Sequence, residues 1–172
     1  MSEVVENATF DERMYEKYEL HYLPGRDRPA HVFDLVYGRR VTDPAEIGWL
    51  VATAWSDAHI PAASMSIAVW IELFQMGGYT EDGHPAQRPT RPLTLYRCAD
   101  PRRVHRLAWT ASLEIAQMFA VINSTRYGQI PRHIYTVTVE PERVLAHITT
   151  RKEDEYVTDT RGLRATRIEV TS

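Results

Sequence analysis

The chain has 172 residues, of which 44% are hydrophobic and 25% are charged, and its formal net charge is −3. These values are typical of one globular domain, and they exclude an intrinsically disordered chain. The slightly acidic balance also lacks the strongly basic character of a general nucleic-acid-binding protein.

The first ninety residues predict a helical subdomain. Residues 31–37 form a short apolar run that predicts one strand. A helix start is expected at Thr42-Asp43-Pro44, because a capping side chain directly precedes a proline. A second helix is expected from about Ser64 to the Gly77-Gly78 pair, and residues 80–92, with three prolines, predict a loop.

Residues 91–172 predict a β-rich core around one amphipathic helix at 112–121. Strands are expected at 93–98, 133–139, 144–149, 155–159 and 164–170, where β-branched and aromatic residues are frequent. We therefore expect an α+β protein, with residues 1–90 as the helical part and 91–172 as the core of one compact domain.

The cysteine and histidine content argues against disulfides and metal sites. Cys98 is the single cysteine, which excludes an intramolecular disulfide, and we interpret it as a small buried residue. None of the seven histidines stands at a metal-ligand spacing, so we expect no metal site. Without a signal-like or membrane-spanning segment, we expect a cytoplasmic protein with no membrane contact.

Arg97 is the first candidate for a functional site. It stands next to Tyr96 near the end of an apolar strand, where a cation is expensive to bury unless it meets an anion. Its planar guanidinium suits a phosphate or a carboxylate. Taken alone, a structural ion pair with a nearby acid is the favoured alternative.

The second candidate is the Ala108-Trp109-Thr110 segment that precedes the helix. The hydroxyl of Thr110 can donate and accept hydrogen bonds, and Trp109 can form the wall of a site for a flat ring. The simpler alternative is that Ser112 caps the helix while Trp109 belongs to the core.

The third candidate is the acidic segment Glu153-Asp154-Glu155. Three adjacent acids usually form a solvated turn, but in an extended chain Glu153 and Glu155 would point to the same face and Asp154 to the other. Two carboxylates on one face can divide the tasks of a catalytic site.

In this order the three candidates resemble the arginine–serine/threonine–glutamate pattern of ADP-ribosyltransferases, the class that includes the cholera-like toxins. Leu95-Tyr96-Arg97 is similar to the first element of that pattern, Ala108-Trp109-Thr110 to the second and Glu153-Asp154-Glu155 to the third. The resemblance covers roughly residues 93–163. It departs from the family where Ala108 replaces the first serine and Trp109 the central threonine, which leaves Thr110 as the hydroxyl.

The resemblance implies a split pair of small antiparallel sheets and an enzyme that uses NAD as co-substrate. Glu155 would stabilise the ribose as its bond to nicotinamide breaks, and Glu153 would act on the acceptor. Arg97, Tyr96, Trp109 and Thr110 would bind NAD. A protein acceptor is implied, with arginine favoured because of the glutamate pair.

Two alternatives to protein modification remain at this point. The first is an NAD glycohydrolase, or an enzyme that modifies a nucleic acid or a small molecule, for which the basic residues Arg102, Arg103 and Arg106 leave room. The second is a catalytically inactive binding module with the same fold, and Ala108 is its best support.

Overall fold

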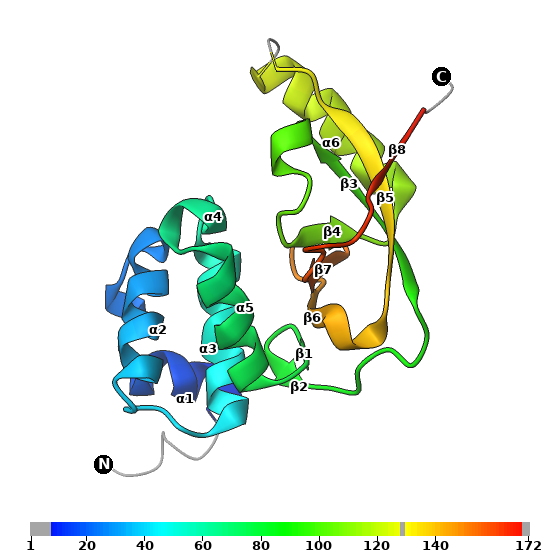
Figure 1. Ribbon diagram of the computed structural model, residues 1–172. Helices are drawn as coiled ribbons and strands as arrows, with labels where there is room; N and C mark the ends of the chain where they lie inside the picture. The colour runs from blue at the N-terminus through cyan, green and yellow to red at the C-terminus, as the bar shows by residue number, and fades with distance from the viewer. Residues whose placement is uncertain (1–7, 128–129, 170–172) are drawn as a thin grey trace, which may run out of the picture.

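The computed structural model of the protein describes residues 8–127 and 130–169. Helices from the first half of the chain form one body, and the sheet and helix α6 (Leu113–Tyr127) form a second body beside it, as Figure 1 shows. No helix within these described ranges is long and apolar enough to cross a membrane.

The helix that the sequence predicts to start at Thr42-Asp43-Pro44 does begin at Pro44. The Asp43 side chain accepts a hydrogen bond from the Glu46 backbone N–H at 3.1 Å, and Pro44 occupies the first helical position. In the described residues, the helices before the sheet are α1 (Phe10–Lys17), α2 (Arg28–Tyr37), α3 (Pro44–Asp57), α4 (Pro61–Ser64) and α5 (Ile67–Gly77). Short 3₁₀ turns lie at Leu20–Tyr22, Gly25–Asp27, Pro101–Arg103 and Pro141–Arg143.

The described strands form one open, eight-stranded sheet in the order β2-β1-β6-β7-β4-β3-β5-β8. Their bounds are β1 (Thr80–Glu81), β2 (His84–Pro85), β3 (Leu93–Ala99), β4 (Ala108–Thr110), β5 (His133–Val139), β6 (Val144–Ile148), β7 (Glu155–Thr158) and β8 (Thr166–Ile168). The predicted mixed α and β architecture is confirmed, and all five expected strands of the second half are present.

The sheet differs from the predicted split pair of antiparallel sheets. Hydrogen bonds connect all eight strands, and β1 runs parallel to β6. The connection between β3 and β4 is nevertheless minimal, because their register consists of the single pair Tyr96–Thr110. β3 pairs with β5 along its whole length, so the sheet consists of two well-paired halves that meet at one point.

A hairpin within the predicted loop 80–92 extends the sheet into the first half of the chain. Asp82 and Gly83, with φ of 47° and 84°, form the two-residue turn between β1 and β2. Both residues adopt the positive φ that favours Asp-Gly in tight hairpins. Since β1 pairs with β6, the predicted helical subdomain 1–90 also contributes two strands to the sheet, from a segment that was predicted to be a loop.

The predicted strand at residues 31–37 is wrong, because this segment is helix α2. Its buried residues are Pro29, Val32, Leu35 and Val36, and their spacing follows the period of a helix. Proline in the first turn, Pro29, also favours a helix start. Packing of this apolar stripe therefore outweighs the β propensity of the individual residues.

The core has two parts. The larger cluster packs the helices against one part of the sheet and includes Leu50, Trp70 and Phe74 with Val157. The smaller cluster, which includes Leu95 and Trp109, packs on strands β3 to β5. Helices α3 and α5 therefore belong to the same packed unit as β6 and β7, and this position brings them to the site described below.

We expect Gly77→Ala to destabilise the protein, because α3 and α5 touch at two glycines. A Cβ at position 77 would lie 2.5 Å from the Gly48 Cα and 2.6 Å from the Gly48 nitrogen, so backbone would have to move. Overpacking of this kind costs about 1–3 kcal/mol in free energy of unfolding, measured by urea denaturation. The exposed Met76→Ala on the same helix should change it by no more than about 0.5 kcal/mol. Equal stabilities for the two variants would contradict this close contact.

Candidate functional site

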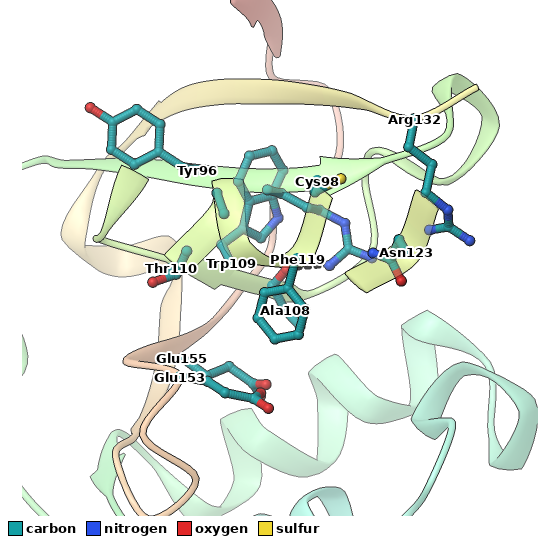
Figure 2. Close-up of a pocket in the computed structure, with 12 residues that line it drawn as sticks. Tyr96, Cys98, Ala108, Trp109, Thr110, Phe119, Asn123, Arg132, Glu153 and Glu155 are labelled. Atoms are coloured by element: carbon teal, nitrogen blue, oxygen red, sulfur yellow. Dashed lines mark hydrogen bonds between the residues drawn. The ribbon is translucent and has the colours of Figure 1, made fainter. Parts of the chain in front are cut away.

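A cavity of about 290 Å³ lies between α6, the junction of β3 and β4 and the turn before β7. Figure 2 shows the side chains of Glu153 and Glu155 directed the same way, below strand β4, which carries Ala108 and Thr110. The cavity is lined by every residue that the sequence singled out for the site: Tyr96, Arg97, Trp109, Thr110, Glu153 and Glu155. The fold thus brings three separate segments of the chain together.

The register of three strands explains why these segments meet. Thr110, at the end of β4, pairs with Tyr96 on one side and with Glu155 on the other. Because paired residues on neighbouring strands lie about 5 Å apart, this places Glu155, the first residue of β7, two strands from Arg97. Thr110 therefore determines the separation of the two charged candidates.

Arg97 is a partly buried cation with no acidic ion-pair partner among the described residues. One guanidinium N–H, on Nη1, donates a hydrogen bond to the Ala108 carbonyl, while the buried Nε has no hydrogen-bond partner among the described residues. Burial, together with repulsion from Arg106, lowers the pKa of Arg97 to about 10. Within those residues no acid forms an ion pair with Arg97, so the structural ion pair that the sequence favoured is absent there.

Glu155 is a partly buried carboxylate held by a residue from the helical half. The indole N–H of Trp55, on α3, donates a hydrogen bond to Glu155 Oε1 at 2.5 Å. Burial raises the pKa of Glu155, and the negative charge of Glu153 raises it further. The Trp55 hydrogen bond and the positive charges of Arg151 and Arg97 act in the opposite direction. A carboxylate with strongly opposed influences on its pKa is typical of functional sites.

The turn before β7 separates the three acids as the sequence predicts, though by a different backbone path. Glu153 and Glu155 line the cavity, whereas Asp154 lies 2.7 Å from His147 Nε2, outside it. Lys152 and Asp154 adopt positive φ angles of 57° and 44°, so this is a tight turn rather than an extended chain. The Asp154–His147 contact keeps the middle acid out of the cavity.

Asp82 and His147 anchor this turn, and the sequence analysis assigned neither of them to the site. Asp82, in the β1–β2 hairpin, accepts hydrogen bonds from the Thr149 backbone N–H at 2.7 Å and its hydroxyl at 2.5 Å. The His147 ring stacks on Tyr156 with centroids 4.2 Å apart. The Asp82-Gly83 pair is a recognisable hairpin signal, but no local signal indicates that Asp82 would reach Thr149.

Trp109 and Ser112 have the structural roles that the sequence offered as the simpler alternative. The Trp109 side chain is 2% exposed and donates its indole N–H to the Arg106 carbonyl at 2.8 Å. Ser112 accepts a hydrogen bond from the Ile115 backbone N–H at 3.2 Å and so caps α6. Thr110 accepts one from the Ser112 N–H at 3.2 Å. Contacts of Trp109 and Thr110 with NAD remain predictions.

Tyr96 and Cys98 line the cavity without offering a reactive group to its centre. Figure 2 shows the Tyr96 ring directed away from Glu153 and Glu155. Burial raises the pKa of the Cys98 thiol, which is opposite to the change that activates a nucleophilic cysteine. Cys98 is partly buried, so it is more exposed than the small buried residue that the sequence predicted.

A second cavity, of about 130 Å³, adjoins the first on the side of the helices. The two share Arg97, Ala108 and Glu155. The remainder of its wall consists of six residues from the helical half and three from the second half: Trp55, Ile60, Pro61, Ala62, Ile67, Trp70, Arg106, Leu107 and Arg151. The helical half is therefore part of the site, although no motif in its sequence indicates this.

In the part of the chain that the structure describes, no three histidine, cysteine or acidic side chains come close enough to hold a metal ion. No protein-family model, curated protein or solved structure matches the chain.

We expect Glu155→Gln to stabilise the fold at neutral pH. Because burial raises the pKa of Glu155 above its ordinary 4.5, the folded protein binds the proton more tightly than the unfolded chain. The free energy of unfolding of the wild type therefore falls as the pH rises from 4.5 to the raised pKa. The fall is about 1.4 kcal/mol for each unit by which the pKa is raised. Glutamine removes this loss and keeps an oxygen that can accept the Trp55 hydrogen bond.

Thermal unfolding at a series of pH values measures this effect. The difference in Tm between Glu155→Gln and wild type should be largest above the raised pKa and should shrink as the pH falls from that pKa toward 4.5, below which Glu155 is neutral in both the folded and the unfolded wild type. A constant difference across the series would show that Glu155 does not titrate abnormally. The exposed Glu142→Gln is the matched control, and its Tm should follow that of wild type.

Proposed function

We propose that the protein is a mono-ADP-ribosyltransferase that splits NAD and transfers ADP-ribose to a protein side chain, with arginine as the favoured acceptor. One observation carries the proposal: the arginine, the hydroxyl residue and the glutamate pair of the resemblance line one cavity, although they come from three separate segments. Chance matches of short motifs would not be expected to converge in this way. Cys98, Asn123 and Arg132 complete the polar lining.

The fit of NAD to this site rests on Arg97. A guanidinium whose buried Nε lacks a hydrogen-bond partner among the described residues is costly, and an anionic ligand would compensate that cost. Its planar fork suits a phosphate group of the dinucleotide. The larger cavity, of about 290 Å³, matches the lower end of small-ligand pockets, roughly 300–1,000 Å³. The adjoining cavity offers room for the remainder of an extended molecule.

Glu155 is the residue proposed to lower the barrier. NAD supplies a ribose that becomes positively charged as its bond to nicotinamide breaks and nicotinamide leaves with the electron pair. A fixed carboxylate stabilises positive charge that develops next to it, and partial burial strengthens this interaction. Glu155 has both properties, since Trp55 holds it and the surrounding side chains bury it.

Glu153 is proposed to act on the acceptor. It lines the same cavity as Glu155 and raises the pKa of that neighbour through its own charge. As the acceptor nitrogen forms its bond to the ribose, the acceptor loses a proton, and Glu153 would take it. The two carboxylates would thus have different tasks, because one acts on NAD and the other on the acceptor.

We expect Glu155→Gln to lower nicotinamide release from NAD by roughly 100-fold or more, since it removes the negative charge but keeps the shape. Release is measured by chromatography with the purified full chain and NAD at millimolar concentration. Glu142→Gln, an exposed acid outside the cavity, should release nicotinamide at the wild-type rate. No nicotinamide release and no transfer of labelled ADP-ribose by the wild type would overturn the proposal.

Glu153→Gln is expected to separate the two steps. Nicotinamide release should remain within a few-fold of wild type, because Glu155 is retained, whereas transfer of labelled ADP-ribose to a polyarginine or protein acceptor should fall by roughly 100-fold. The ratio of transfer to release is the measured quantity. An equal fall in both rates would assign Glu153 to NAD cleavage instead.

A second candidate function, modification of a nucleic acid, is favoured by charge. Arg106 and Arg151 line the smaller cavity, and neither guanidinium has an ion pair or hydrogen bond within the described residues. Beside Arg97 they would repel an arginine acceptor and attract phosphate. Parallel assays with labelled NAD and protein, RNA or DNA acceptors distinguish these functions.

A third candidate is a binding module without catalysis, which the missing hydroxyl at Ala108 favours. It predicts no nicotinamide release and no heat of NAD binding in calorimetry, whereas both enzymatic functions require NAD to bind.

A further inference from the structure

The helical half of the protein contacts the proposed catalytic carboxylate through one hydrogen bond. Trp55 Nε1 and Glu155 Oε1 lie 2.5 Å apart, although the two residues are separated by 100 positions in the chain. Trp55 also lines the smaller cavity, directly beside the carboxylate. The segments that carry the resemblance to ADP-ribosyltransferases do not include this residue.

Trp55 is held rigidly by the packing around it. Its side chain is 6% exposed, and its ring meets Trp70 edge-on, with centroids 5.1 Å apart and an interplanar angle of 89°. The Phe74 ring also packs against Trp55, with centroids 5.7 Å apart. Both partners belong to α5, which is fixed to α3 by the contact of Gly48 with Gly77. A donor locked in this way can fix the orientation of the group that it contacts.

The strands that flank Glu155 offer it little comparable support. Ala108, which borders both cavities, has no hydroxyl group. The Thr110 hydroxyl oxygen accepts a hydrogen bond from the Ser112 backbone N–H. An indole N–H, in contrast, can only donate, so it selects the carboxylate oxygen as its acceptor. Trp55 therefore donates a hydrogen bond to Glu155 from outside the three motif segments.

We infer that Trp55 is a positioning residue, which holds the Glu155 carboxylate in place for the reaction through its indole N–H. The inference rests on the proposed function, since it assigns Trp55 a task in that reaction. The hydrogen bond to the ionised carboxylate also lowers the pKa of Glu155 and so opposes the effect of burial. Loss of the N–H should thus affect both the orientation and the ionisation of Glu155.

Trp55→Phe tests this inference, because it keeps an aromatic ring in the same packing and removes the N–H. Trp49→Phe is the matched control. Trp49 lies on the same helix, is 3% exposed and donates its indole N–H to Asp11 at 2.7 Å, outside the two cavities that contain Glu155. Both variants lose one indole–carboxylate hydrogen bond. Only Trp55→Phe should change the pKa and the orientation of the Glu155 carboxylate.

Two readouts are measured on the full chain. The first is the pKa of the Glu155 carboxyl, from the pH dependence of its ¹³C signal, which requires no activity. The second is the pH profile of kcat/KM for nicotinamide release. In Trp55→Phe both should move to higher pH, and kcat/KM on the acid limb should fall about tenfold for each unit of the move. Trp49→Phe should leave both at the wild-type position.

The possible results separate the inference from the proposed function. An unchanged Glu155 pKa and pH profile in Trp55→Phe, with active wild type, would overturn the inference alone. A wild type that releases no nicotinamide would overturn the proposed function, and with it the task of Trp55, whatever the titration shows.

If Trp55→Phe does not fold, the Trp55 indole ¹H–¹⁵N signal of the wild type still tests whether Trp55 contacts Glu155. It should move as Glu155 titrates and should lose that movement in Glu155→Gln, and a signal that does not move would contradict the inference.

Discussion

The arrangement of the site depends on the single residue pair through which the two halves of the sheet meet. Tyr96 on β3 and Thr110 on β4 are the one register position that these strands share, and Thr110 also pairs with Glu155 on β7. Beyond that pair the Arg97 guanidinium, instead of a backbone amide, bonds to the Ala108 carbonyl. The Arg97 side chain thus replaces part of the hydrogen-bond ladder between β3 and β4, and the cavity lies beside this contact. A longer β3–β4 ladder would close the space into which a ligand could enter.

Two opposite charges stand close to this junction without forming an ion pair in the described residues. Burial works against the charged form of both, since it lowers the pKa of Arg97 and raises that of Glu155. A protein built for stability alone would join such groups or replace them with apolar side chains. Here each group has a fixed position and unused capacity for interaction, Arg97 toward an anion and Glu155 toward a cation. A ligand with phosphate at one end and a cationic ring at the other has both complementary charges.

Much of the sheet could be predicted from the sequence, because residues such as 133–139 and 144–148 combine β-branched side chains with clear turn signals. The segment 31–37 was misassigned, since its β propensity is local whereas its helical form depends on packing against other helices. The convergence of Arg97, Thr110 and Glu155 was predicted from motif order. Trp55 could not be found in this way, because nothing near it in the chain indicates a partner 100 residues away.

The contacts of the helical half give it a direct connection to the site. Its β1–β2 hairpin provides Asp82, which binds the start of the acidic turn at Thr149 and Thr150, and its helix α3 provides Trp55, which binds the end of that turn at Glu155. Glu153 lies between these two attachment points. A boundary near residue 90 therefore divides the sequence by composition but does not divide the site. The first half of the chain therefore holds both ends of the turn, one through Asp82 in a strand hairpin of the sheet and the other through Trp55 on a helix that packs against it.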